Sequence, residues 1–256
     1  MNNSPIDIDK LIEGTNEILT ANRNSLQLFD MLHSMRQFDD LTYVHSVNVA
    51  LIASILGQWL KFNEKDIRIL TISGLLHDIG KIMIPNEILT KPGKLTVAEY
   101  NIMKQHVNFG YEKVKNQNID IRIKEACLLH HEKCDGTGYP FGLKSDHIPA
   151  VAKIIAIADV YDAMTSARVY RGALCPFEVI DTMYKDAFTK FEPEYILPFL
   201  KNVASSYINN DVRLSDGRIG KVVLINENAL SLPIVQCEDE FIDLSKTRGL
   251  TVSAIL

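Results

Sequence analysis

Five of the seven histidines lie in or beside apolar stretches with helical spacing: His45, His77, His106, His130 and His131. A single histidine on an apolar face is most often a hydrogen-bonded core residue. Five histidines that all point inward from separate helices would instead form one cluster. Imidazole clusters of this kind bind transition-metal ions.

Two aspartates accompany these histidines. Asp78 directly follows His77, and Asp159 ends the apolar run of residues 154–158. A bare His-Asp pair carries little information, but a carboxylate inside an apolar helix is costly unless it is paired or coordinates a cation. A mixture of imidazole and carboxylate ligands suits iron, manganese, zinc or cobalt, and contains too much nitrogen for a typical magnesium site.

Seven candidate ligands are too many for one catalytic metal ion, which usually has three or four protein ligands and an open position. Two metal ions bridged by a carboxylate would accommodate all seven. Because adjacent helix residues point about 100° apart, His77 and Asp78 can reach different sides of such a cluster. Paired metal ions promote in-line displacement at phosphorus and generate hydroxide at neutral pH.

A glycine-rich segment, residues 135–140, follows the two histidines at residues 130 and 131. Its sequence is Asp-Gly-Thr-Gly-Tyr-Pro. A loop of this composition is usually only a turn. Because it lies directly beside two candidate ligands, and because glycine permits close approach of the backbone, we expect it to line the same site.

Helical periodicity dominates the chain as far as about residue 208 and predicts a mainly α fold. We expect helices at residues 6–35, 42–60, 63–80, 96–110, 119–132 and 151–164, and two more after Pro176 and Pro193. Thr96 and Glu99 have the spacing of a capping box. Turn residues then separate short β-like runs at residues 211–225, 232–235, 240–244 and 250–256. This tail is small for an independent core, so we expect it to pack on the helices or on a partner.

The composition places the chain among ordinary globular proteins. Its 256 residues are 46% hydrophobic and 23% charged, which argues against disorder. A net charge of −5 gives no basic footprint, so we expect no nucleic-acid polymer as a partner. The four cysteines form no CxxC pair and are expected to be reduced. Without a signal peptide or a long apolar run, we expect a cytoplasmic protein with no membrane partner.

The sequence resembles the HD-GYP family, a bacterial branch of the HD phosphohydrolases. The resemblance rests on His-His-Glu-x-x-Asp-Gly-x-Gly-Tyr-Pro at residues 130–140 and on His-Asp-Ile-Gly-Lys at residues 77–81. Similar segments at residues 84–95, 157–166 and 168–171 occur in the same order. The match covers roughly residues 38–203. It implies a bundle of helices around a centre of two or three metal ions, and hydrolysis of cyclic di-GMP.

The resemblance also implies which residues bind the metal ions. One ion would be held by the basic quartet His45, His77, Asp78 and Asp159. A second would be held by His106, His130 and His131, with Asp78 as the bridge. Members with three metal ions carry a glutamate one turn before the first histidine, where this chain has Leu41. We therefore expect two ions, with iron or manganese as the leading candidates.

The same resemblance implies residues for catalysis and substrate binding. Asp78 and Lys81 would be catalytic, with Lys81 facing the phosphate or the developing charge. Arg168 and Arg171 would contact the dinucleotide phosphates, with ordinary surface salt bridges as the alternative. Tyr139 would stack on a base or brace the loop. Apart from the resemblance, the position of Glu132 beside the two histidines indicates that it orients a ligating imidazole or fixes the loop.

We therefore expect a mainly α chain in three parts: an N-terminal helical segment at 1–37, an HD-GYP catalytic domain at 38–204 and a β-rich appendage at 205–256. The expected reaction is attack of a metal-activated hydroxide on a phosphodiester of cyclic di-GMP, giving pGpG, GMP or both.

Three alternatives stay open. The substrate could be another cyclic or linear dinucleotide such as cyclic GMP-AMP, since the ligands are indifferent to the base. The chain could be a signalling module that binds nucleotide and hydrolyses little. The β-rich appendage could be a docking surface, for a cyclase or for a second copy in a homodimer.

Overall fold

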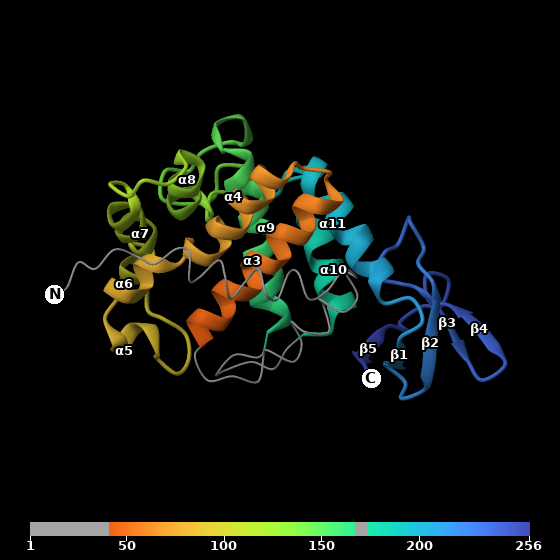
Figure 1. Ribbon diagram of the computed structural model, residues 1–256. Coiled ribbons are helices and arrows are strands. Elements are labelled where there is room, and N and C mark those ends of the chain that lie inside the picture. The colour runs from red at the N-terminus through yellow and green to blue at the C-terminus, as the bar shows by residue number, and fades with distance from the viewer. Residues whose placement is uncertain (1–40, 167–173) are drawn as a thin grey trace. The chain divides into compact units, whose positions relative to one another are not determined.

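Helices make up about half of the described chain, residues 41–166 and 174–256 of the computed structural model (Figure 1). The predicted helix at 6–35 and the predicted phosphate-binding residues Arg168 and Arg171 lie outside these ranges. Contacts group the chain into two compact units, Met1–Asp159 and Val160–Leu256, each taken by itself below. The domain boundaries expected at residues 37 and 204 stay predictions.

The regular elements in the described part of the first unit are all helices, joined by loops. Its elements are α3 (Leu41–Trp59), α4 (Glu64–Leu76), the 3₁₀ helix η1 (Ile79–Met83), α5 (Asn86–Leu89), α6 (Val97–Met103), α7 (His106–Val114), α8 (Ile121–Leu129), the 3₁₀ helix η2 (Ser145–His147) and most of α9 (Ala150–Thr165). Helix α3 packs along α4, α4 packs on α8, and α7 packs on both α8 and η1.

Helix α3 is the central helix of this unit. Every residue from 45 to 57 is buried, and most of them are apolar. A helix that is buried all round cannot keep its polar residues on a solvent face. The imidazole of His45 and the amide of Asn48 therefore lie inside the unit, where they need polar partners.

Two predicted helices are interrupted in the structure. The helix expected to reach residue 80 ends at Leu76, with His77 at its C-cap, and the chain continues into η1. The helix expected from residue 96 to 110 is divided into α6 and α7. Its start is as predicted, because the Thr96 side chain and the Glu99 carboxylate form a capping box. Both predictions of continuous helices were wrong, and both breaks lie immediately before or at a candidate ligand.

The second unit combines two helices with a sheet. Helices α10 (Pro176–Asp186) and α11 (Pro193–Ser206) pack on each other. The five antiparallel strands are β1 (Asp211–Leu214), β2 (Ile219–Leu224), β3 (Ile234–Cys237), β4 (Glu240–Asp243) and β5 (Val252–Ile255). Their order is β4-β3-β2-β1-β5, and β5 packs on α10. The mainly α fold with a small C-terminal β part is confirmed, and so are the four predicted β regions.

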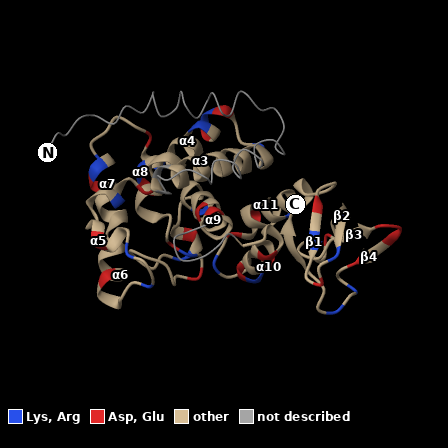
Figure 2. Ribbon diagram, turned by 90° about the horizontal axis from the view of Figure 1, so that it is seen from below, with Lys and Arg blue, Asp and Glu red and all other residues tan. Residues whose placement is uncertain are grey.

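Acidic and basic residues are interspersed along the described helices and strands (Figure 2). No described helix combines the length and apolarity that crossing a bilayer requires.

The packing of α3 on α4 leads to a first prediction. A β-carbon on Gly74 would lie 2.4 Å from the Cα of Ala50, so Gly74→Ala must push the two backbones apart. We expect a loss of about 1–3 kcal/mol in the free energy of unfolding, as for other overpacked cores. Urea denaturation followed by circular dichroism measures it.

Gly57→Ala is the matched control on the facing helix. Its β-carbon would meet the Cδ1 of Leu70 at 2.7 Å, and this methyl group can rotate away. The gain in helix propensity, up to about 1 kcal/mol, offsets part of the cost. Equal denaturation midpoints for the two variants would contradict the close backbone approach at Gly74.

Candidate metal centre

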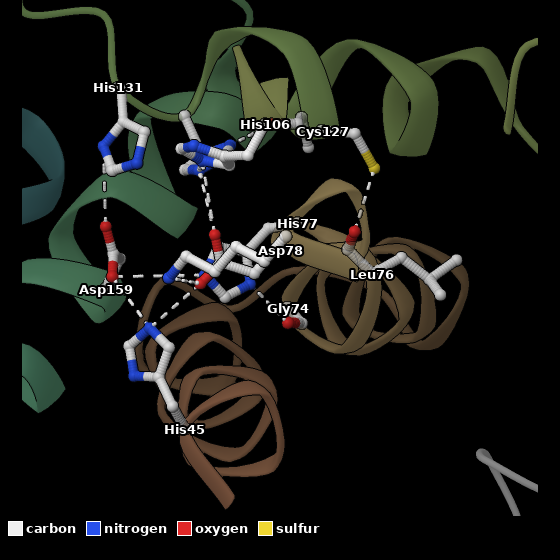
Figure 3. Close-up of polar contacts among 12 residues, drawn as sticks. His45, Gly74, Leu76, His77, Asp78, His106, Cys127, His131 and Asp159 are labelled. Carbon is white, nitrogen blue, oxygen red and sulfur yellow. Dashed lines mark hydrogen bonds and ion pairs between the residues drawn. The ribbon is translucent and has the colours of Figure 1, made fainter. Parts of the chain in front are cut away.

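The structure brings all seven predicted ligands together in the first unit (Figure 3). They form two groups. The first contains Asp78, His106, His130 and His131, and the second contains His45, His77 and Asp159. Within each group, one potential ligand atom from each residue lies within 4.8 Å of the others. All are buried except His131, which is half-buried.

Five separate elements supply these side chains. Helix α3 provides His45, the junction of α4 and η1 provides His77 and Asp78, and α7 begins at His106. The end of α8 provides His130 and His131, and α9 provides Asp159. Segments that are far apart in sequence thus converge on one point, as Figure 3 shows.

The carboxylate of Asp78 lies between the two groups. Its Oδ2 is 3.3 Å from Nε2 of His77 and 3.6 Å from Nε2 of His45. Its Oδ1 is 3.3 Å from Nε2 of His106 and 3.9 Å from Nε2 of His130. One oxygen therefore faces each group, which is the arrangement that a bridging carboxylate requires.

Backbone carbonyls orient three of the imidazoles. Nδ1 of His77 donates to the Gly74 carbonyl at 2.7 Å. Nδ1 of His106 contacts the Met103 carbonyl at 2.8 Å, and Nδ1 of His130 contacts the Ala126 carbonyl at 2.9 Å. Because a carbonyl oxygen only accepts, each Nδ1 carries the proton, and each Nε2 presents a lone pair to the cluster. This is the usual way in which a ligating histidine is held.

The first of these contacts also explains why α4 ends early. The Gly74 carbonyl lies near the C-terminus of the helix, where backbone acceptors lose their intrahelical partners. The His77 imidazole satisfies that carbonyl from inside the protein. The chain then turns into η1, a 3₁₀ helix, instead of continuing as α-helix.

The 3₁₀ turn sets the position of Lys81. Side chains three residues apart in a 3₁₀ helix lie above one another. Lys81 accordingly donates from Nζ to Oδ2 of Asp78. The turn also lies tight against α7, because a β-carbon on Gly80 would lie 1.9 Å from the carbonyl oxygen of His106. The absence of a side chain at Gly80 thus lets Asp78 approach His106.

Burial and charge set the protonation states. Burial lowers the pKa of His106, lowers the pKa of His130 well below its ordinary value, and lowers that of His131 to about 3. Burial alone would raise the pKa of Asp78, but Lys81 and the neighbouring imidazoles hold it well below its ordinary value. At neutral pH these three imidazoles are uncharged and the carboxylate is ionised, which are the forms that bind metal.

The polar atoms of the cluster fit a metal ion. Nε2 of His77 and Oδ1 of Asp78 are buried and have no hydrogen-bond partner within the described part of the chain. Leaving such atoms unsatisfied is costly. A cation placed among the imidazole lone pairs and carboxylate oxygens would satisfy them, and imidazole with carboxylate is a donor set typical of transition metals.

The loop after His131 is held by a buried carboxylate. Glu132 is only 4% exposed and accepts the backbone N–H groups of Phe141, Gly142 and Leu143 at 2.7–3.1 Å. Three N–H donors on one carboxylate fix the position of residues 141–143, at the end of the loop. Of the two alternatives for Glu132, these contacts support the one in which it fixes the loop.

The half-buried ring of Tyr139 packs on one of the candidate ligands. Its ring stacks on that of His131, with 4.7 Å between centroids and 29° between planes. Its backbone N–H donates to the carbonyl of His131 at 3.2 Å. These contacts support the brace rather than the base platform. Sequence reasoning missed Tyr100 and Lys104, whose side chains lie against the Tyr139 ring. Their spacing on α6 gave no signal beyond that of an ordinary helix.

The HD domain family matches residues 13–195, well over half of the chain. The chain belongs to the HD domain family. The resemblance to its HD-GYP branch agrees with this match. The chain is 36% identical over 203 residues to the cyclic di-GMP phosphodiesterase PA4108 of Pseudomonas aeruginosa, covering 79% of this chain and 49% of that protein. It is 37% identical over 173 residues to the 3′3′-cGAMP-specific phosphodiesterase 1 of Vibrio cholerae, covering 66% of this chain and 38% of that protein.

A solved structure shares the fold. An HDG"Y"P protein from Bdellovibrio bacteriovorus aligns with a TM-score of 0.59 and 19% identity, over 77% of this chain and 64% of that one. The HD-type helical fold expected from the sequence is therefore confirmed. The chain spans about half the length of several curated relatives that it matches.

The buried carboxylate of Glu132 gives a second prediction. In Glu132→Gln the amide keeps only one acceptor oxygen and turns an NH₂ group toward backbone donors. We expect a loss of about 1–3 kcal/mol of stability, the cost of buried donors left unsatisfied. We also expect weaker metal retention, since the loop carries the Tyr139 brace. Thermal denaturation and metal analysis measure the two effects.

Asp146→Asn is the matched control, because Asp146 is an exposed carboxylate of the same region that contacts His147. It should leave both readouts unchanged. If Glu132→Gln behaved like Asp146→Asn, Glu132 would not hold the loop.

Proposed function

We propose that the protein hydrolyses cyclic di-GMP to pGpG, GMP or both, as a metal-dependent phosphodiesterase. The observation that carries this proposal is the Asp78 carboxylate shared by two groups of ligands. A site that holds two metal ions around one carboxylate is suited to in-line displacement at phosphorus. The similarity to a cyclic di-GMP phosphodiesterase from Pseudomonas aeruginosa supports the choice of substrate.

In this proposal two transition-metal ions, iron or manganese, bind the cluster. His45, His77 and Asp159 would hold one ion and His106, His130 and His131 the other, with Asp78 lying between the two groups. When bound, such ions supply a hydroxide nucleophile at neutral pH and stabilise negative charge on the phosphoryl oxygens.

The chain's own residues orient the substrate and exclude water. The side chains of six ligands are at most 11% exposed, whereas that of His131 is 26% exposed, so the cluster opens on the side of His131. Lys81, 21% exposed and bound to Asp78, places a fixed positive charge at the same centre. An ammonium has three N–H donors, so Lys81 can contact Asp78 and a phosphoryl oxygen together. Arg168 and Arg171, outside the described residues, are proposed to bind the dinucleotide phosphates.

Cyclic GMP-AMP is the second candidate substrate. The chain resembles a 3′3′-cGAMP-specific phosphodiesterase as closely, by identity, as it resembles the cyclic di-GMP enzyme. The ligand cluster contacts phosphate and does not discriminate between bases. Relative turnover of the two cyclic dinucleotides decides between them. A module that binds nucleotide without hydrolysis is less favoured, because it has no need of all seven ligands.

Metal analysis combined with turnover gives the third prediction. Protein purified anaerobically should retain two metal ions per chain and convert cyclic di-GMP to pGpG or GMP. Chelation should abolish turnover, and Fe(II) or Mn(II) should restore it. A loaded centre that leaves both cyclic dinucleotides intact would count against the phosphodiesterase and favour the binding module.

Removal of the shared carboxylate gives the fourth prediction. Asp78→Ala deletes a ligand from both groups, so metal content and turnover should both fall, turnover by about a thousandfold or more. Asp146→Ala, which removes an exposed carboxylate that is not one of the seven candidate ligands, is the control and should change neither. Circular dichroism shows whether each variant is folded. Full activity of Asp78→Ala would exclude the shared carboxylate from the reaction.

A further inference from the structure

A half-buried lysine lies one aromatic ring away from the metal centre. Nζ of Lys104 is 5.2 Å from the centre of the Tyr100 ring and 5.9 Å from the centre of the Tyr139 ring. The Tyr139 ring in turn stacks on His131. Lys104 thus contacts the ring that stacks on His131, the most exposed candidate ligand, and the mechanism proposed above does not use it.

The surroundings of Lys104 leave its charge available. Among the described residues, no carboxylate lies within ion-pair distance of its ammonium group, whose neighbours there are the two aromatic rings. Aromatic faces attract a cation but do not neutralise it. A half-buried ammonium of this kind is a site for an anion that arrives from solvent.

Tyr100 adds an aromatic surface next to this charge. Its side chain is 48% exposed, although a tyrosine on α6 could have been packed into the core. It meets the Tyr139 ring edge to face, with 6.5 Å between centroids. One face of the Tyr139 ring stacks on His131, whereas about half of the Tyr100 side chain is open to solvent. Exposed tyrosines of this kind bind nucleobases by stacking, irrespective of the base.

The chemistry of a cyclic dinucleotide requires two subsites. It carries two phosphates and two bases, and only the phosphate that reacts can lie at the metal centre. The second phosphate and its nucleotide must lie outside the cluster, next to it. A cation and an exposed aromatic ring against Tyr139, whose ring stacks on His131, suit the phosphate and the base of that half of the molecule.

We propose that Lys104 and Tyr100 form the subsite for the half of the substrate that does not react, with Lys104 binding its phosphate and Tyr100 stacking on its base. The inference rests on the proposed function, and it assigns two substrate contacts. It also distinguishes substrates by class, because a diester with a single phosphate and no base would not use this subsite.

The experiment measures binding and turnover separately. Binding of the hydrolysis-resistant bisphosphorothioate analogue of cyclic di-GMP to the metal-loaded protein is followed by calorimetry. Lys104→Gln should weaken it by about tenfold or more, as expected for one charge-assisted contact. Lys104→Arg, which keeps the charge, should restore most of the affinity. Tyr100→Leu should weaken binding, and Tyr100→Phe should not.

Two controls separate this role from a structural one. Lys124→Gln removes the same charge from a lysine that donates to the Lys115 carbonyl, and should leave affinity unchanged. Hydrolysis of bis(4-nitrophenyl) phosphate, which has one phosphate, should be equal in wild type and Lys104→Gln, as should metal content. If Lys104→Gln lowered the hydrolysis of bis(4-nitrophenyl) phosphate and the metal content, Lys104 would serve only to pack on Tyr139, and the proposal would be overturned.

The remaining outcomes are also decisive. Equal affinity of wild type and Lys104→Gln for the analogue, or failure of the wild type to bind it, would overturn the subsite. Wild-type protein that binds the analogue through Lys104 but releases no pGpG or GMP from cyclic di-GMP would overturn the proposed function alone.

Discussion

The buried carboxylate of Asp78 is the constraint on which the first unit depends. An ionised carboxylate that is only 2% exposed is unfavourable unless positive charge and donors surround it. The protein supplies Lys81 on one oxygen and places imidazoles from both ligand groups around the two oxygens. Burial lowers the pKa values of His106, His130 and His131, so these three imidazoles contribute lone pairs rather than positive charge to the cluster at neutral pH. A cation bound among these donors would complete the cluster, and its binding would then stabilise the folded unit.

The backbone of the unit is arranged to deliver that cluster. Because α4 ends at Leu76, the side chains of His77 and Asp78 both reach the cluster. The Gly74 carbonyl near the helix end holds the His77 ring. Gly80 lets η1 lie against the start of α7, which brings Asp78 to His106. The central helix α3 contributes His45 from a fully buried stretch. Each of these features places a polar group where the core would otherwise be apolar, and the ligands are thus part of the core.

The sequence was sufficient to predict which side chains gather in the cluster and insufficient for the details around them. A histidine or aspartate in an apolar helix has few uses, so the type and context of His45, His106 and Asp159 predicted one cluster, and the structure brings them together. Helix ends were harder. The periodicity continued through residue 80 and through residues 104 and 105, whereas the structure ends α4 at Leu76 and separates α6 from α7. Gly80 lies against the carbonyl of His106 between these breaks, and periodicity contains no information about such contacts.

The same limit explains why residue type alone could not assign a role to Tyr139. Residue type alone left Tyr139 as base platform or brace, and only the stack on His131 favours one. His77, His106 and His130 are oriented from inside by carbonyls, whereas His131 is the most exposed ligand and the Tyr139 ring packs on it from outside. Its position therefore depends on the loop that Glu132 ties down. In the proposed reaction, substrate would approach the centre from the side of this histidine, whose side chain is the most exposed of the seven. At His131, therefore, the position of the imidazole is set by loop residues, Tyr139 and the segment bound by Glu132, rather than by a helix.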